Sequence, residues 1–398
     1  MFLDYNKTMR GTIMRKLVVI LSILSAAALL PGQQQFDITV RNVSVPVRVF
    51  DGDSFVDDLT LEDFEILEDG KPQKAMALYL TRKAEIERME GRDYMPYSGR
   101  FFYFIFQLYE NHPRILEALD YFFSEIYVPE DQLVVMTPLK VYELNKELVA
   151  SSPKEQVVEY IQGTIRKDTL TAAQQYNSLM KDLVRNAQGV SRGDVTSALP
   201  QYRQNLMKLE QVTAQDERRL VGFASQLKRI DGQKNVFYFC QSEYRPKLRP
   251  LTLSSLLEAN QDVPNIYGEL QELFTFYTKE SNLDIERITQ IFADSAILFN
   301  FIYINRRPEG GGGNIQMEEQ SEDVYEAFSK IAESTGGAVE NSQNPAAALE
   351  KSAALSESYY LLYYSPENYR QDGEYKSITV KVKGREYKVY HRLGYVAD

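Results

Sequence analysis

The sequence is poor in the residues that most often build cross-links and active sites. Its 398 residues include one cysteine, Cys240, two histidines, His112 and His391, and no tryptophan. A single cysteine excludes an intramolecular disulfide. Phosphate-binding glycine loops, zinc-ligand spacings and the Gly-x-Ser-x-Gly elbow are also missing from the chain. The sequence therefore predicts no cofactor, and Cys240 with His112 forms the only candidate nucleophilic pair.

Basic residues are in deficit as well. Lysine and arginine total 45 against 56 aspartates and glutamates, which gives a net charge of −11. A protein that binds nucleic acid needs a basic excess to neutralise phosphates, so we expect no nucleic-acid partner. The apolar fraction of 44% and the charged fraction of 25% are typical of folded globular proteins. The length is sufficient for two or three domains.

The first apolar run has the layout of an export signal. Arg15 and Lys16 precede the uncharged segment 17–30, and small residues at 26–28 lie near its end. A mostly apolar segment of fourteen residues is short for a helix that spans a bilayer. We therefore predict a signal peptide at 1–32 and export, with the periplasm favoured over secretion or surface association. An uncleaved anchor is the alternative, and it would be the only membrane contact.

The two flanks of the chain share a strand-like pattern. Apolar residues alternate with polar ones in segment 36–95, as in Val43, Val45 and Val47, and the pattern returns in 356–398. Alternation of this kind is typical of strands with one buried face. We expect both flanks to form one small antiparallel β domain, an Ig-like sandwich, into which the rest of the chain is inserted.

The middle segment, 96–355, alternates strands with helices. Residues 101–106, 236–240 and 296–304 are almost unbroken apolar runs, which indicate strands buried on both faces of a parallel sheet. Helical patterns lie between them, and one of these ends at Gly336, where glycine can adopt the left-handed conformation. The order predicts an α/β fold with a doubly wound, mostly parallel sheet.

Two helical stretches, 153–228 and 252–293, are longer than such a sheet requires. Two interpretations of the first remain open: a helical insertion packed on the sheet edge, or a projecting helical hairpin that contacts a partner. Segment 359–364 carries four tyrosines that cannot all face one core. Part of it is therefore expected to form an exposed aromatic surface suited to protein contacts.

The flanking motifs resemble those of a known family. Four short motifs occur in the same order as in von Willebrand factor A-related (vWA) proteins of the acidobacterial type. They are Leu59-Thr60-Leu61-Glu62-Asp63-Phe64, Glu68-Asp69-Gly70-Lys71-Pro72-Gln73, Tyr359-Tyr360-Leu361-Leu362-Tyr363-Tyr364-Ser365-Pro366 and Gly394-Tyr395, and their sequences are similar to those of that family. The resemblance implies an exported vWA-like protein, generally without enzymatic activity.

In that family, a metal-ion-dependent adhesion site lies on the loops that follow the strands. The resemblance implies an Asp-x-Ser-x-Ser loop after the first strand, and in this chain Gln107, Tyr109 and Asn111 stand in its three key positions. Gln241 stands in the place of a second aspartate. Hard cations require carboxylate and other oxygen ligands, so we predict a degenerate site that holds no metal.

The functional prediction is a non-catalytic protein-interaction or envelope-scaffolding module with a protein partner of unknown identity. The candidate interaction surface consists of Tyr109, Glu110, His112, Ser242, Glu243 and Tyr244. One alternative is a metal-dependent adhesion domain with substituted ligands, for which Glu110 and Glu243 are the candidates. We interpret these two instead as solvated loop carboxylates. A remote alternative is a cysteine-dependent enzyme that uses Cys240 and His112.

Overall fold

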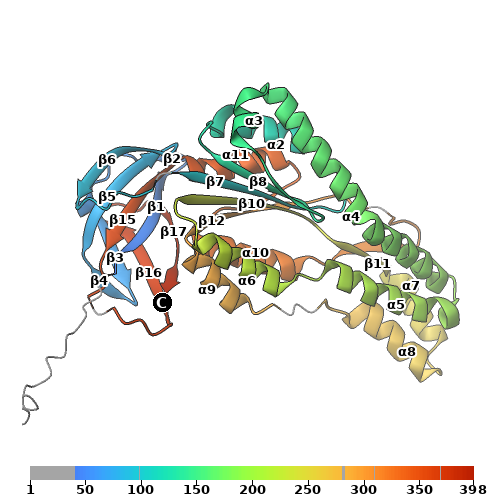
Figure 1. The fold of residues 1–398 in the computed structure, drawn as a ribbon. Coiled ribbons are helices and arrows are strands. Elements are labelled where there is room, and N and C mark those ends of the chain that lie inside the picture. Colours follow the sequence, from blue (N-terminus) through green and yellow to red (C-terminus); the bar gives the residue numbers. More distant parts are fainter. Residues whose placement is uncertain (1–40, 98, 280–282, 309, 368) are drawn as a thin grey trace, which may run out of the picture. The chain divides into compact units, whose positions relative to one another are not determined.

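A computed structural model describes residues 41–97, 99–279, 283–308, 310–367 and 369–398 as a mixed α/β structure (Figure 1). The predicted signal peptide, 1–32, lies outside the described residues. Within the described segments, no helix has both the length and the apolar character needed to cross a bilayer.

Two antiparallel sheets form a β-sandwich from the two flanks of the described chain. The first sheet has the order β17 (Lys388–His391), β1 (Val43–Asp51), β15 (Ser358–Tyr364), β5 (Ala75–Arg82) and β6 (Glu85–Gly91), and β2 (Ser54–Phe55) pairs with β1. The second has the order β18 (Gly394–Val396), β16 (Tyr375–Val382), β3 (Phe64–Glu68) and β4 (Lys71–Gln73). A short 3-10 helix, η1 (Leu61–Asp63), precedes β3. Strands from opposite ends of the sequence therefore pair directly, with Val45 opposite Leu362.

The alternating apolar residues of these strands meet in one core between the two sheets. Its members include Val43, Val45, Val47, Val49, Ile66, Leu78, Tyr360, Leu362, Ile378 and Val380. The Asp69-Gly70 turn joins β3 to β4 with both residues in the left-handed region, at φ of 48° and 75°. This is the backbone that a two-residue hairpin turn requires.

The prediction of an exposed aromatic surface on β15 is wrong. Tyr359, Tyr360 and Tyr364 are buried, because β15 is an inner strand of the first sheet and both of its faces are covered. On the face away from the sandwich core, the Arg48 guanidinium lies over the ring of Tyr359, and Tyr363 stacks on Tyr94 with 4.5 Å between ring centroids.

The central sheet is mostly parallel. Its order is β14 (Val339–Ser342), β12 (Ile297–Ile304), β10 (Gln233–Gln241), β7 (Arg100–Gln107), β8 (Gln132–Met136) and β9 (Val141–Glu143). Each neighbouring pair is parallel except β8 with β9. Strands β10 and β12 are buried along their whole length, which explains the long apolar runs within them.

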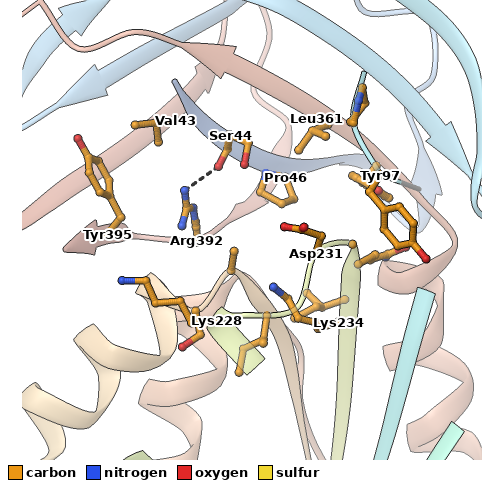
Figure 2. A pocket seen from close by; sticks show the side chains of 18 of the residues that line it. Val43, Ser44, Pro46, Tyr97, Lys228, Asp231, Lys234, Leu361, Arg392 and Tyr395 are labelled. Atoms are coloured by element: carbon orange, nitrogen blue, oxygen red, sulfur yellow. Dashed lines mark hydrogen bonds between the residues drawn. The ribbon is translucent and has the colours of Figure 1, made fainter. Parts of the chain in front are cut away.

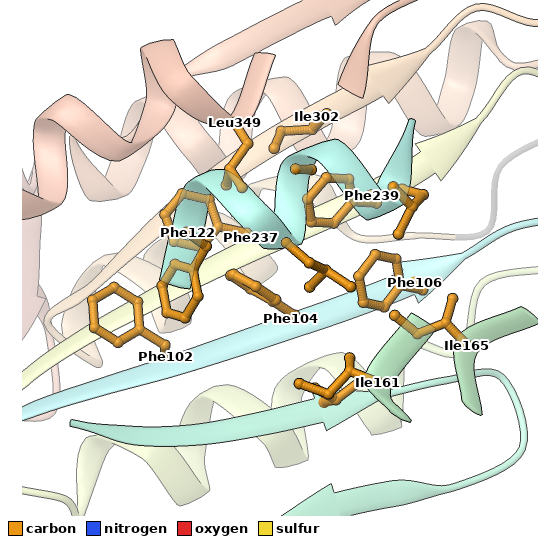
Figure 3. Packing of buried hydrophobic residues seen from close by; sticks show 14 of the residues in the cluster. Phe102, Phe104, Phe106, Phe122, Ile161, Ile165, Phe237, Phe239, Ile302 and Leu349 are labelled. Atoms are coloured by element: carbon orange, nitrogen blue, oxygen red, sulfur yellow. The ribbon is translucent and has the colours of Figure 1, made fainter. Parts of the chain in front are cut away.

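Helices cover both faces of this sheet (Figure 1). On one face lie α2 (Ile115–Tyr121), the π-helical η2 (Phe122–Ile126), α11 (Pro345–Glu357) and the first half of α4 (Lys154–Ser191). Figure 3 shows the aromatic core that they enclose, which contains Phe102, Phe104, Phe106, Phe122, Phe237 and Phe239. On the other face lie α6 (Glu217–Lys228), α9 (Ile285–Asp294) and α10 (Glu322–Thr335). Helix α10 ends at Gly336 in the left-handed conformation, as predicted.

The two long helical stretches divide between the sheet and a separate core. Helices α6 and α9 pack on the sheet, whereas the second half of α4 packs with α5 (Val195–Thr213), α7 (Pro250–Ala259), α8 (Pro264–Gln271) and η3 (Glu272–Phe276). An antiparallel ribbon of β11 (Tyr244–Leu248) and β13 (Ile315–Glu319) contributes Leu248 and Ile315 to this helical core. The short α3 (Lys146–Ser151) precedes α4. The first stretch therefore packs on the sheet through α6 and the first half of α4, and in the helical core through α5 and the second half of α4.

Gly337 provides a test of this packing. A Cβ atom at this position would lie 1.9 Å from the carbonyl oxygen of Phe299 in β12, so the backbone just after α10 and that of the sheet are in direct contact here. We expect Gly337→Ala to lower the free energy of unfolding by about 1–3 kcal/mol or more, since the clash is with main chain. In α8, Gly268 has open space around its Cβ position, so Gly268→Ala should raise stability by about 0.5–1 kcal/mol. Urea unfolding measures both, and a tolerated Gly337→Ala would contradict the contact.

Candidate functional site

The predicted site residues follow two neighbouring strands of the central sheet. Strand β7 ends at Gln107 and β10 at Gln241, and the two strands are parallel with Cys240 opposite Gln107. Because the carboxyl ends of parallel neighbours lie at the same edge of the sheet, the loops that follow them meet there. Residues 108–110 and 242–244 are therefore brought together.

The side-chain amide of Gln241 joins these two loops. It is fully buried, and its Oε1 accepts hydrogen bonds from the backbone N–H groups of Tyr109 (2.8 Å) and Glu110 (3.1 Å). Its Nε2 donates to the carbonyl oxygen of Glu110 at 3.2 Å. An amide has both the acceptor and the donors that this loop needs. A carboxylate in the same place would set one oxygen against the Glu110 carbonyl.

Glu243 forms a buried chain of polar contacts behind that loop. Its Oε1 accepts a hydrogen bond of 2.6 Å from the Tyr109 hydroxyl, and its Oε2 accepts one of 2.9 Å from the Lys279 ammonium. Its backbone N–H donates to Ser321 Oγ at 2.7 Å. Burial, together with the Glu243 charge, raises the pKa of Tyr109 well above its ordinary value.

The interpretation of Glu243 as a solvated loop carboxylate is therefore wrong. The residue is only 4% exposed, because the start of α10 and the segment before it cover its backbone and Lys279 covers its side chain. Glu110 differs, since its side chain remains 41% exposed, with 3.7 Å between its Oε2 and a terminal nitrogen of Arg306.

Arg306 organises the outer part of the site. Its Nε donates to the carbonyl oxygen of Ser242 (2.8 Å), and a terminal nitrogen donates to the Tyr176 hydroxyl (2.7 Å). The Tyr244 hydroxyl donates to the Arg306 carbonyl oxygen at 3.0 Å, and the guanidinium lies 5.6 Å from the centre of the Tyr244 ring. These contacts fix a charged side chain in one position at the carboxyl edge.

A pocket of about 490 Å³ opens beside Arg306, and we call it the carboxyl-edge pocket. Its lining includes Tyr176, Met180, Lys181, Tyr244, Arg306, Met317 and Glu110. Tyr109 stacks behind Tyr176 with 4.1 Å between ring centroids, so the pocket wall is continuous with the loop that Gln241 holds. Of the predicted surface residues, Glu110 and Tyr244 line the pocket directly.

Sequence reasoning missed Tyr176, Lys279 and Arg306. They come from α4, from the segment after η3 and from the loop after β12, so no local motif marks them. For Arg306 the available signal is its place just after a strand of the parallel sheet, at the edge where ligands bind in such folds.

The remaining predicted residues lie apart from the pocket. Asn111 and His112 are half-buried between β7 and α2, and the Arg114 N–H donates to His112 Nδ1 at 3.3 Å. Burial lowers the pKa of His112. The Cys240 thiol lies in the core under α10, on the opposite face of the sheet from α2, and burial raises its pKa. The structure therefore does not assemble a Cys240–His112 pair.

The residues at this edge do not fit a divalent cation. Gln241 and Gln107 offer no charge, Glu243 is ion-paired with Lys279, and Glu110 faces Arg306. Within the described residues, no three acidic, histidine or cysteine side chains converge as a ligand set. Hard cations need several oxygen ligands that include carboxylates, so the local chemistry favours hydrogen bonding over metal coordination.

No protein-family model, curated protein or solved structure matches this chain. No relative therefore supplies a function for the carboxyl-edge pocket. What the pocket binds has to be inferred from its own side chains.

Replacing the Gln241 amide tests its role at this edge. We expect Gln241→Glu to lower the free energy of unfolding by about 3 kcal/mol at neutral pH, because it buries a charge against the Glu110 carbonyl. The loss should shrink as the pH falls, since burial raises the pKa of the new carboxyl and its protonated form can donate as the amide does. Gln107→Glu makes the same charge change at a half-buried position and should cost less than about 1 kcal/mol. Equal losses in the two variants, measured by urea unfolding, would refute the role of the amide.

Cys240 offers a direct test of the enzyme alternative. Its side chain is 1% exposed and burial raises the pKa of its thiol, so the nucleophilic thiolate is both shielded and scarce. A disulfide exchange reagent should label the native protein at least a hundredfold more slowly than the urea-unfolded protein, roughly in proportion to the open population. Ser178→Cys, on the exposed side of α4, provides a reactive control in a Cys240→Ala background. Rapid native labelling of Cys240 would restore the enzyme alternative.

Proposed function

We propose that this chain is an exported, non-catalytic protein-interaction module with a metal-free vWA-like domain inserted in an Ig-like sandwich. The order of the parallel strands and the helices on both faces of the central sheet support a doubly wound vWA-like architecture. The signal-like segment at 15–30 supports export, with the periplasm favoured.

The observation that carries the proposal is the closure of the carboxyl edge by the Gln241 amide. In the family that the sequence resembles, a metal ion at this edge binds the partner. Here a neutral side chain satisfies the loop after β7 through three hydrogen bonds. A partner must therefore recognise the side chains around the edge.

Those side chains have the composition of an interface core. Tyrosine, methionine and arginine are enriched at the centres of protein interfaces, and the carboxyl-edge pocket contains Tyr176, Tyr244, Met180, Met317 and Arg306. Arg306 is already held by Ser242 and Tyr176, so ordering it on binding costs little entropy. We infer a partner that inserts an apolar or aromatic side chain into this pocket. Both recognition of a partner and scaffolding of the envelope would use this contact.

The metal-dependent alternative finds less support. Its candidate ligands from the sequence are Glu110 and Glu243, and each already lies beside a cation of the same chain. A bound divalent ion would have to displace the Lys279 ammonium, which lies in a largely buried position, 11% exposed. The proposed interaction is therefore independent of Mg²⁺.

Site-specific photo-crosslinking in the native envelope tests the proposal. A photoreactive residue at Asn177, which lines the carboxyl-edge pocket, should capture one discrete protein with equal yield in Mg²⁺ and in EDTA. The same residue at Gln175, exposed on another side of α4, is the matched control and should not capture that protein. The partner purified from this capture should bind Met317→Glu at least about tenfold more weakly than wild type, because a charge would enter an apolar contact.

Two results would overturn the proposal. Capture that requires a divalent cation would favour a metal-dependent site. Equal capture from Asn177 and Gln175, or unchanged affinity in Met317→Glu, would show that the pocket is not the contact surface.

A further inference from the structure

A second pocket lies at the opposite, amino-terminal edge of the central sheet, and we call it the amino-edge pocket. It has a volume of about 570 Å³ and lies between the β-sandwich and the starts of β10 and β12. Strands β1 and β15 line one side, and the ends of α6 and α9 line the other. Figure 2 shows Ser44, Arg392, Lys228 and Lys234 around its interior.

Basic side chains outnumber acidic ones in its lining. Five cationic residues, Arg41, Arg48, Lys228, Lys234 and Arg392, face two acidic ones, Asp231 and Asp294. Two of the five have carboxylate partners: Lys228 contacts Asp294 and Asp398 at 2.6 Å each, and Arg41 contacts Asp398 at 3.1 Å. For Arg48, Lys234 and Arg392, no carboxylate of the described residues lies within ion-pair distance. This local positive excess occurs in a chain whose net charge is −11.

The three cations without carboxylates are also buried. Arg48, Lys234 and Arg392 are 2%, 5% and 8% exposed. Each donates to a backbone carbonyl: Arg48 to Leu355, Lys234 to Ile230 at 2.9 Å and Arg392 to Ser44 at 2.7 Å. The Nε of Arg392 has no hydrogen-bond partner among the described residues. A buried charge without an ion-pair partner is costly, so an anion bound in this pocket would stabilise these three side chains.

The ionisation of these groups agrees with that interpretation. Burial, followed by repulsion from Arg392, lowers the pKa of Lys234 to about 8, and the exposed Asp231 acts in the opposite direction. Burial lowers the pKa of Arg48 to about 10 and also lowers the pKa of Arg392. Burial therefore disfavours the charge of both Lys234 and Arg392, and at Arg392 the nearby Asp294 and Tyr364 act in the opposite direction without pairing with it.

The backbone around the pocket is strained as well. Met95 and Ala296 line it with φ of 47° and 51°, in the left-handed region that side chains other than glycine disfavour. Such conformations persist where the surrounding structure holds them, and they occur preferentially at functional sites.

We propose that the amino-edge pocket binds a small oxyanion that carries two or more negative charges, with Lys234 and Arg392 as its principal ligands. An arginine presents its donors as a planar fork that suits phosphate and carboxylate oxygens, and a lysine adds a point charge. The site is separate from the carboxyl-edge pocket, so the failure of either proposal leaves the other standing.

Calorimetric titration of the full chain tests the proposal. The probes are sulfate, inorganic phosphate, pyrophosphate and citrate, with chloride at matched ionic strength as the reference. We expect one saturable site for at least one dianionic or more highly charged probe. Lys234→Met and Arg392→Gln should each weaken its affinity roughly tenfold or more, because each removes a buried charged contact. The preferred probe distinguishes a phosphate-type ligand from a carboxylate-type one.

The matched control is Lys247→Met. Lys247 is also largely buried, at 18% exposure, but it is paired with Glu318 at 2.8 Å in the β11–β13 ribbon and does not line the amino-edge pocket. This variant loses the same charge and should bind as wild type does. If the control binds the probe as weakly as the two variants do, the loss of affinity is a general effect of net charge. If wild type shows no saturable heat of binding, the cations serve only to hold the sandwich against the sheet. Either result overturns the proposal.

A pH series gives an independent readout if a variant folds poorly. Sulfate stays a dianion across the neutral and alkaline range, so any change in its affinity comes from the protein. Affinity should fall as the pH rises through about 8, because Lys234 loses its proton there while the arginines stay charged. In Lys234→Met the same series should be flat. A flat series in wild type would exclude Lys234 as a ligand.

Discussion

The three hydrogen bonds of the Gln241 amide set the arrangement of the whole carboxyl edge. The loop after β7 presents two N–H groups and one carbonyl to a buried position, and only a side chain that both accepts and donates satisfies all three. With the loop held there, Tyr109 reaches Glu243 with its hydroxyl and stacks on Tyr176 with its ring. The sheet is thereby joined to α4 and the helical core.

The two edges of the central sheet differ in whether their charged side chains have ion-pair partners. At the carboxyl edge, Glu243 meets Lys279 and Glu110 meets Arg306, so the charges are compensated within the chain. At the amino edge, Lys234 and Arg392 share one pocket with no carboxylate partner among the described residues. A compensated edge with tyrosine and methionine suits contact with a protein surface. An uncompensated, buried cationic pocket suits a small anion.

The sequence predicts those features that depend on local pattern. Unbroken apolar runs such as 101–106 mark strands that are buried on both faces, and parallel neighbours place the ends of β7 and β10 together. Burial of Glu243 could not be predicted, because Lys279 and Ser321 reach it from distant segments without any periodicity. The β11–β13 ribbon could not be predicted for a related reason. Its charged residues are typical of a loop, and it forms strands because Arg245 pairs with Glu318 across the ribbon.

The amino-edge pocket has no local signature, because its ligands come from the two ends and the middle of the chain. Arg48 and Arg392 belong to the sandwich flanks, and Lys234 lies near the start of β10 in the central sheet. The same strand ends at Gln241, so β10 carries a principal residue of each site. It is buried throughout and hydrogen-bonded to β7 and β12 along its length, so it cannot slide without breaking both registers. Coupling between two sites requires an element with two conformations, and a strand held in one register cannot transmit a conformational change from one pocket to the other. The two sites are therefore expected to bind independently, although one strand positions both.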